Sequence, residues 1–103
     1  MLYSYEDKKE VLNTEQSAGY LLAETAKNDI VELHIHQNGF VPAHALPIDV
    51  IFYVISGRGS ITVSGDVQNV SRGDVVEVKK DLDRTWQNPH NEPLTLLVIK
   101  MKS

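Results

Sequence analysis

The sequence contains no cysteine and no long apolar run, and these two absences exclude several classes of protein. Without thiols the chain cannot form a disulfide, a thiolate metal site or a cysteine nucleophile. No apolar run approaches the roughly 20 residues that a membrane helix needs, and the first residues lack the apolar core of a signal peptide. We therefore expect a cytoplasmic protein that has no membrane partner.

Positive charge is also scarce, because 10 Lys and Arg residues are outnumbered by 14 Asp and Glu residues, which gives a net charge of −4. Proteins that bind nucleic acids or anionic membranes usually carry clustered Lys and Arg, and no such cluster stands out here. We expect no nucleic-acid partner.

The 103 residues suffice for one domain with a small core, and 42% apolar and 23% charged residues are typical of a folded chain.

The most informative stretch is an unbroken apolar run from Val50 to Ile55 that Gly57 closes. It is short and rich in β-branched and aromatic residues, which favours a strand buried on both faces over a helix. Pro42 and Pro47 precede it, and because they lack N–H donors we expect them outside the hydrogen-bonded ladder. His44 then lies in a loop that leads into a rigid strand, a place where proteins often hold binding groups.

Two further histidines lie on a predicted strand over residues 30–37, which alternates apolar and polar residues. The apolar set, Val31, Leu33 and Ile35, is expected to face the core. His34 and His36 then share the other face, where they are exposed to solvent or to a subunit. The alternative is that these two histidines form a metal pair, which would require the apolar face to point outward.

The rest of the chain is typical of an all-β sandwich or barrel. Turn signals at Gly65-Asp66 and Gly73-Asp74 separate short apolar strands, and no amphipathic helix is evident. Residues 1–19 are mixed and polar, and we interpret them as a short irregular N-terminal arm of the same domain. Residues 20–103 would then form the β-barrel.

Two motifs in this chain resemble those of the small single-domain cupins. The first consists of Gly39, Pro42, His44, Pro47, Tyr53, Val54 and Gly57, and the second of Gly73, Asp74, Arg84 and Asn88. The resemblance covers most of the chain, from about residue 30 onward. It implies a double-stranded β-helix, that is, a jelly-roll barrel, and it implies a homodimer.

The resemblance does not extend to the metal ligands of that family, which are a His-x-His pair, a Glu and a later His. His44 stands at the first of these positions, but Leu46, Val50 and Arg84 stand at the other three. These three side chains offer no lone pair to a divalent ion, so we expect no cofactor. A divalent metal would have to use His44 with Asp49, which is one residue out of register, or His34 with His36.

The resemblance implies instead a metal-free pocket that contains one imidazole and one guanidinium. Arginine is always charged and its planar fork suits a carboxylate or phosphate, so Arg84 would anchor a small organic anion. An alternative is that Arg84 forms a salt bridge with a nearby aspartate such as Asp49, Asp81 or Asp83. The expected pocket residues are His44, Arg84, Tyr53, Trp86, Leu46, Val50 and Asp49.

Three functions remain compatible with this sequence. The first, which we favour, is a non-catalytic or metal-independent binder of a small organic anion with an accessory or sensing role. The second is a metal-free isomerase or epimerase with His44 as general base and Tyr53 or another hydroxyl as acid. The third is a metal-dependent dioxygenase or isomerase with relocated ligands. Nothing in the sequence supplies a clear partner to orient His44, which weighs against the second.

Overall fold

The computed structural model describes residues 1–102, which are dominated by β-strands. One 3₁₀ turn, η1 (Tyr5–Asp7), precedes the strands. The strands in chain order are β1 (Lys9–Asn13), β2 (Ser17–Glu24), β3 (Asn28–Ile35), β4 (Phe40–His44), β5 (Asp49–Ser56), β6 (Arg58–Val63), β7 (Asp66–Ser71), β8 (Val75–Val78), β9 (Arg84–Gln87) and β10 (Leu94–Met101). Within this part of the chain no helix is long and apolar enough to cross a membrane.

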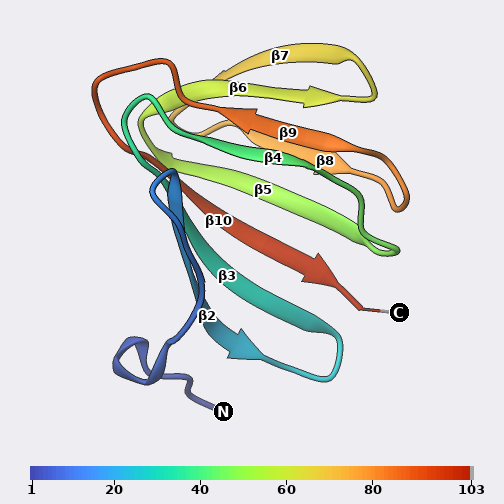
Figure 1. The fold of residues 1–103 in the computed structure, drawn as a ribbon. Helices are drawn as coiled ribbons and strands as arrows, with labels where there is room; N and C mark the ends of the chain where they lie inside the picture. Colours follow the sequence, from blue (N-terminus) through green and yellow to red (C-terminus); the bar gives the residue numbers. More distant parts are fainter. Residues whose placement is uncertain (103) are drawn as a thin grey trace.

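The strands form two antiparallel sheets that lie one above the other (Figure 1). The six-stranded sheet has the order β1-β2-β3-β10-β5-β8, and the four-stranded sheet has the order β4-β9-β6-β7. Strands that are distant in sequence are neighbours in both sheets, since β10 lies between β3 and β5 and β9 lies between β4 and β6. This exchange of strands between layers is the jelly-roll arrangement, so the predicted double-stranded β-helix is confirmed.

The core lies between the two sheets and follows from the two-residue period of the strands. In β3 the side chains of Val31, Leu33 and Ile35 are buried, as the alternation predicts, and His34 lies on the opposite face, whereas His36 follows the end of the strand. The strands β5 and β10 bury every second residue in the same way. The buried apolar residues are Val31, Leu33, Ile35, Val50, Phe52, Val54, Ile61, Val70, Val78, Trp86, Leu94, Leu96 and Val98.

The strand β5 corrects the expectation that its apolar run is buried on both faces. Val50, Phe52 and Val54 are buried, but Tyr53 is 41% exposed and Ile55 is 38% exposed. Only one face of the six-stranded sheet packs against the other sheet, so alternate residues of the run point away from the core. An unbroken apolar run does not reveal this, because both faces of the strand carry apolar side chains.

The N-terminal region is more regular than the sequence indicates. Lys9–Asn13 form β1, which pairs with β2 at the edge of the six-stranded sheet, and β2 begins at Ser17. The residues of β1 are mostly polar and exposed, so the strand gives little apolar signal. Gly19 allows the two strands to approach, because a Cβ at that position would lie 3.2 Å from the Cβ of Leu12.

Pro42 also departs from the expectation, since it lies inside β4 and not in a connecting loop. The pairing of β4 with β9 shifts register between Val41 and His44. The missing N–H of the proline therefore falls at an irregularity, where strands tolerate it. His44 is accordingly the last residue of a strand.

Asn88 connects the two layers at the end of β9 and is almost fully buried. Its Nδ2 donates to the carbonyl oxygens of Ile35, His36 and Glu92 at 3.1, 3.1 and 2.7 Å, and its Oδ1 accepts from the backbone N–H of His90 at 3.1 Å. Buried polar groups need such partners. This residue of the second motif therefore has a structural role.

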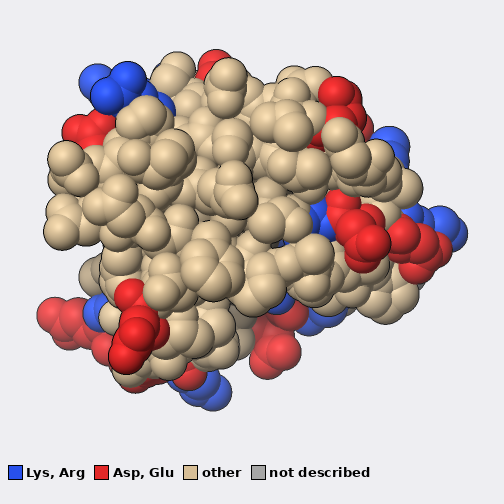
Figure 2. Space-filling model, turned by 45° about the horizontal axis from the view of Figure 1, so that its top comes forward, with Lys and Arg blue, Asp and Glu red and all other residues tan. Residues whose placement is uncertain are grey.

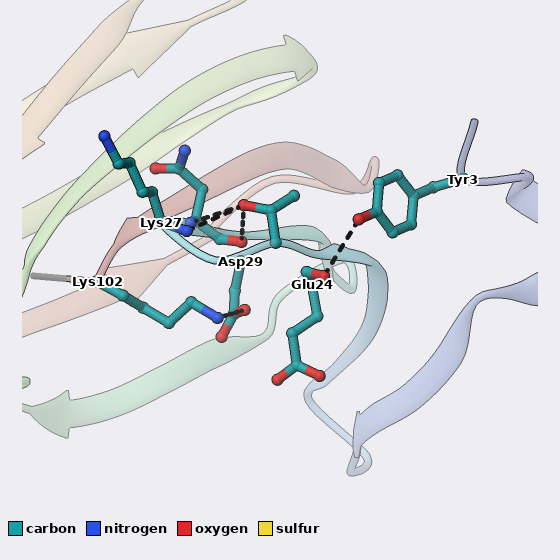
Figure 3. Close-up of polar contacts among 7 residues, drawn as sticks. Tyr3, Glu24, Lys27, Asp29 and Lys102 are labelled. Carbon is teal, nitrogen blue, oxygen red and sulfur yellow. Dashed lines mark hydrogen bonds and ion pairs between the residues drawn. The ribbon is translucent and has the colours of Figure 1, made fainter. Parts of the chain in front are cut away.

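Both ends of the described chain are held at the hairpin that joins β2 and β3 (Figure 3). Lys102 forms an ion pair with Asp29, with Nζ 2.9 Å from Oδ1, and its backbone N–H donates to the carbonyl of Lys27 at 2.8 Å. The hydroxyl of Tyr3 donates to the carbonyl of Glu24 at 3.4 Å.

The charged residues show no basic surface on the face drawn in Figure 2. Most of that face is uncharged, and its Lys and Arg side chains lie near the margins, interspersed with Asp and Glu.

Candidate functional site

A cavity of about 190 Å³ lies between the two sheets and is the candidate site. Most of the residues that line it are apolar, and they come from strands of both sheets. The polar side chains that line it are His44, Arg84, Trp86 and Lys100, and its lining includes no Asp or Glu. The cavity therefore combines an apolar interior with positive charge.

A hollow of similar size, about 220 Å³, lies outside the barrel between the N-terminal segment and β2. Asp7, Lys9 and Glu24 are among its lining residues, and all three belong to exposed parts of the chain. It contains none of the buried side-chain nitrogen or oxygen atoms that lack a partner. We therefore place the candidate site in the interior cavity.

Arg84 is the first residue of β9 and is only 1% exposed. The alternation of β9 directs Arg84 and Trp86 inward together, since they are two residues apart. Nε and Nη2 of Arg84 are buried and have no hydrogen-bond partner among residues 1–102. Burial lowers the pKa of Arg84 from its usual value, and the nearby charge of Asp83 offsets this only in part.

The alternative in which Arg84 forms a salt bridge is not realised in the part of the chain that the structure describes. The ion pairs found there join Arg58 to Glu92, Lys79 to Glu77 and Lys102 to Asp29, and His34 contacts Glu32. Asp49 instead accepts a hydrogen bond from the backbone N–H of Lys80 at 2.8 Å. The guanidinium of Arg84 thus keeps two buried donors without an acceptor.

His44 lies directly opposite Arg84 in the pairing of β4 with β9 and also lines the cavity. Its side chain is exposed, so it lies at the mouth of the cavity. Nδ1 is 3.2 Å from the carbonyl oxygen of Pro42. A carbonyl can only accept, so Nδ1 carries the proton, and in the neutral ring Nε2 presents a lone pair.

The structure brings His44, Leu46, Val50, Arg84 and Trp86 together around one cavity, as the sequence analysis expects. Their positions follow from the strand period of β5 and β9 and from the end of β4.

Tyr53 and Asp49 do not line the cavity, which corrects two of the expected pocket positions. Tyr53 points to the outer face of β5 because the buried residues of that strand are Val50, Phe52 and Val54. Asp49 is an even number of residues from Tyr53 in β5 and therefore points to the same outer face. Its carboxylate accepts the hydrogen bond from the backbone N–H of Lys80.

Nine residues line the cavity that the sequence did not indicate as pocket residues: Lys100, Phe52, Val11, Leu12, Gly19, Val31, Leu33, Val41 and Val98. Lys100 continues the inward series of β10, because Leu94, Leu96 and Val98 have the same parity and are buried. The position of Lys100, an even number of residues from these buried residues, therefore predicts that its side chain points inward. Phe52 packs against Trp86 edge to face, with ring centroids 5.2 Å apart.

The residues at the expected metal-ligand positions do not fit a metal ion. Leu46 and Val50 contribute apolar side chains beside His44, and Arg84 contributes a permanent positive charge, which repels a cation. Within residues 1–102 no group of three or more His, Asp or Glu side chains could hold a metal ion. The donor set of this cavity therefore suits an anion.

His34 lies on the outer face of β3, His36 follows the last residue of that strand, and neither is among the residues that line the cavity. His34 is held by two neighbours, because its Nε2 is 2.9 Å from Oε1 of Glu32 and its Nδ1 is 3.2 Å from Oγ1 of Thr95. Both ring nitrogens of His34 are thus engaged in hydrogen bonds within the sheet surface.

Fold and site together define a small jelly-roll barrel with a ligand-sized cavity that opens beside His44. The chain belongs to the cupin family, since the family described as Cupin domain matches residues 31–100. No curated protein matches the sequence.

Solved structures of other cupin-like proteins are similar to this chain in fold. An RmlC-like cupin from Shewanella frigidimarina is 16% identical, with a TM-score of 0.83 over 95% of this chain and 86% of its own. KdgF from a Halomonas species is 13% identical, with a TM-score of 0.83 over 100% and 94% of the two chains. The polyketide cyclase RemF from Streptomyces resistomycificus is 14% identical, with a TM-score of 0.83 over 98% and 78%. At these identities the likeness concerns the fold alone.

Proposed function

We propose that this protein binds a small organic anion in the cavity between its sheets, without a metal, and acts as an accessory or sensing protein in the cytoplasm. The observation that carries this proposal is the pair of buried N–H donors on Arg84 that have no acceptor among residues 1–102. A buried charge without a partner is unfavourable, and a bound anion would supply both the opposite charge and the acceptors.

The surroundings of Arg84 support the proposal. Among residues 1–102 the cavity lining includes Lys100 and no carboxylate, so the local potential favours an anion. Arg84 cannot be neutralised at physiological pH even with a lowered pKa, because the usual value is far above 7.

Isothermal titration with a panel of small carboxylates and phosphates tests the proposal. The wild type should bind at least one anion, and Arg84→Met should abolish that binding. Arg72→Met removes an exposed arginine and should leave binding unchanged. If no anion binds, or if binding survives in Arg84→Met, the proposal is wrong.

A metal-free isomerase or epimerase is the second candidate, and the orientation of His44 is the observation that favours it. The bond from Nδ1 to Pro42 fixes Nε2 as the basic nitrogen of the neutral ring at the cavity mouth. Among the residues that the structure describes, however, no hydroxyl side chain lines the cavity, and Tyr53 lies on the outer face, which weighs against this second function. Turnover that His44→Gln abolishes while anion binding persists would favour this second function.

We also propose that the protein is a homodimer, as membership of the cupin family suggests. The outer face of the six-stranded sheet supports this, since Tyr53 lies opposite Leu97 and Ile51 opposite Ile99 in register. Sedimentation velocity should give the mass of a dimer for the wild type and of a monomer for Tyr53→Lys. Thr62→Lys, on the other sheet, is the matched control. A monomeric wild type would contradict the proposal.

A further inference from the structure

We propose that the cavity takes a monocarboxylate with a compact apolar body, about the size of benzoate. This inference rests on the proposed anion-binding function and narrows it to one chemical class. Three observations carry it: the arrangement of the donors without partners, the charge of the cavity, and its volume and lining.

The donors without partners on Arg84 have the geometry that a carboxylate requires. Nε and Nη2 lie on one edge of the planar guanidinium, and their N–H bonds project side by side. Two parallel N–H donors match the two oxygens of a single carboxylate, which is the bidentate pairing typical of arginine. A neutral carbonyl offers these two donors a single oxygen and no charge, whereas a carboxylate offers one charged oxygen to each.

A third donor lies on the same face of β9. Nε1 of Trp86 is buried without a partner, and Trp86 is two residues from Arg84 and lines the same cavity. The buried side-chain groups of the cavity that lack partners are therefore all donors, so the ligand must present lone pairs. A carboxylate has about four acceptor sites and can receive from more than one donor.

The charge distribution favours one negative charge on the ligand over two. Arg84 is the one permanently charged residue among the buried polar residues, which are otherwise Ser17 and Asn88. Lys100 is only half-buried, so its ammonium can remain hydrated at the rim. A single carboxylate neutralises Arg84, whereas a dianion would carry an uncompensated charge among apolar side chains.

The remaining wall requires an apolar body. Val31 and Leu33 from β3, Phe52 from β5 and Val98 from β10 are all buried and all line the cavity. A small hydrophilic anion such as phosphate would leave this surface without contact, and an apolar body would cover it.

The volume sets the size of that body. The cavity measures about 190 Å³. An apolar cavity of about 150 Å³ in another protein accommodates benzene. The space here is thus sufficient for one six-membered ring or a branched aliphatic group of similar volume, together with its carboxylate.

The test compares ligands that differ in one property each, by isothermal titration against the wild type at constant ionic strength. Benzoate is the probe. Benzamide has the same ring without the charge, and acetate has the carboxylate without the ring. Inorganic phosphate and succinate represent other classes of anion. Benzoate should bind about tenfold or more tightly than each of the other four, because each lacks either the bidentate charge pairing or the apolar contact. Arg84→Met should abolish benzoate binding and Arg72→Met should preserve it.

The other outcomes separate the two proposals. If phosphate or succinate binds more tightly than benzoate and Arg84→Met abolishes it, the ligand class is wrong and the anion-binding function stands. If acetate binds as tightly as benzoate, the apolar body is not recognised and the class is again wrong. If none of these anions binds to the wild type, or if Arg84→Met retains them, both proposals are wrong. Circular dichroism of each variant verifies that it is folded.

Discussion

His44 and Arg84 occupy opposite positions on the antiparallel strands β4 and β9, and both line the cavity between the sheets. Directly opposite residues of such a pair project to the same face, with Cβ atoms about 5 Å apart. An anion held by Arg84 would therefore lie beside the imidazole of His44. This register relationship links the two residues that the sequence analysis singled out, although they lie 40 positions apart in the chain.

Replacement of Arg84 by methionine should stabilise the unliganded protein while it abolishes anion binding. Burial lowers the pKa of Arg84, so the charged form is less favourable in the folded than in the unfolded state. Replacement of buried ion pairs by apolar groups of similar volume is often neutral or raises the free energy of unfolding by about 1–4 kcal/mol. We expect an increase in this range for Arg84→Met, because Arg84 has no ion-pair partner among residues 1–102 that the substitution would leave unpaired. Urea denaturation without ligand measures this change.

Arg58→Met is the control for that measurement, because Arg58 is exposed and its Nε is 3.8 Å from Oε1 of Glu92. This variant should change the free energy of unfolding by less than about 0.5 kcal/mol. If Arg84→Met instead lowers the free energy of unfolding by about 2 kcal/mol or more, the loss is of the size expected for a broken hydrogen-bond network. Arg84 would then stabilise the fold, and its donors would not be free to bind a ligand.

The protein should not retain stoichiometric metal. Protein purified without a histidine tag, incubated with manganese, iron, nickel or zinc and desalted, should contain well below one ion per chain. The reason is that Leu46, Val50 and Arg84 occupy the positions of three ligands. Elemental analysis of the wild type beside His44→Ala provides the measurement.

Two outcomes of the metal analysis would contradict that expectation in different ways. Near-stoichiometric metal that disappears in His44→Ala would mean that the cavity recruits other ligands. Metal that persists in His44→Ala and disappears in His34→Ala would place the ion on the outer face of β3.

The free energy of unfolding should depend on the ionisation of Glu32, a residue of β3. Burial raises the pKa of Glu32, but the hydrogen bonds from His34 and Tyr5, at 2.9 and 2.8 Å, outweigh it and hold the pKa below its usual value. A lowered pKa in the folded state contributes stability above the unfolded value of about 4.3, and this contribution is lost as the pH falls through the folded value.

Glu32→Gln should therefore reduce the free energy of unfolding by about 1 kcal/mol at pH 7, and its difference from the wild type should shrink as the pH falls below about 4.3 and through the lowered pKa of Glu32. Urea titrations between pH 3 and pH 7 measure both. Glu77→Gln, in an exposed pair with Lys79, should show no comparable pH dependence. A difference that persists unchanged at pH 3 would attribute the effect to packing and not to charge.

Gly57 and Gly65 form a matched pair that separates backbone strain from a steric clash. Their φ angles are +85° and +86°, so alanine is strained at both, by about 1–2 kcal/mol. A Cβ at Gly57 would lie 2.3 Å from the carbonyl oxygen of Pro93, whereas a Cβ at Gly65 would have no neighbour within 4 Å.

Gly57→Ala should therefore lower the free energy of unfolding by about 2 kcal/mol more than Gly65→Ala does, because overpacking adds to the strain. Thermal and urea denaturation of the two variants give the difference. Equal effects would mean that the loop around Pro93 moves away at little cost.

The sequence predicted the fold well because its signals are local and redundant. The alternation of residues 30–37 fixed the inward face of β3, and turn residues such as Gly65 and Gly73 marked the ends of strands correctly. The inward direction of Arg84 followed from the family resemblance and is confirmed by its burial.

The predictions were wrong where the neighbouring residues in the sequence do not show what packs against a side chain. The run from Val50 to Ile55 is apolar on both faces, so it could not reveal that only one face is covered, and Tyr53 was assigned to the wrong side. β1 was missed because edge strands are often polar, and its only half-buried residue is Leu12. The alternation of β10 predicts that Lys100 points inward. Lysine is rarely buried, however, so its residue type argues against that position.

The central position of β10 has a consequence for the order of folding during synthesis. β10 pairs with β3 on one side and with β5 on the other, so the six-stranded sheet remains two separate pieces until residues 94–101 have left the ribosome. Pairings between distant segments carry a large loop-closure entropy and form slowly. The nascent chain therefore exposes the unpaired edges of β3 and β5 late in translation, and chaperones that shield strand edges would have their greatest effect in that interval.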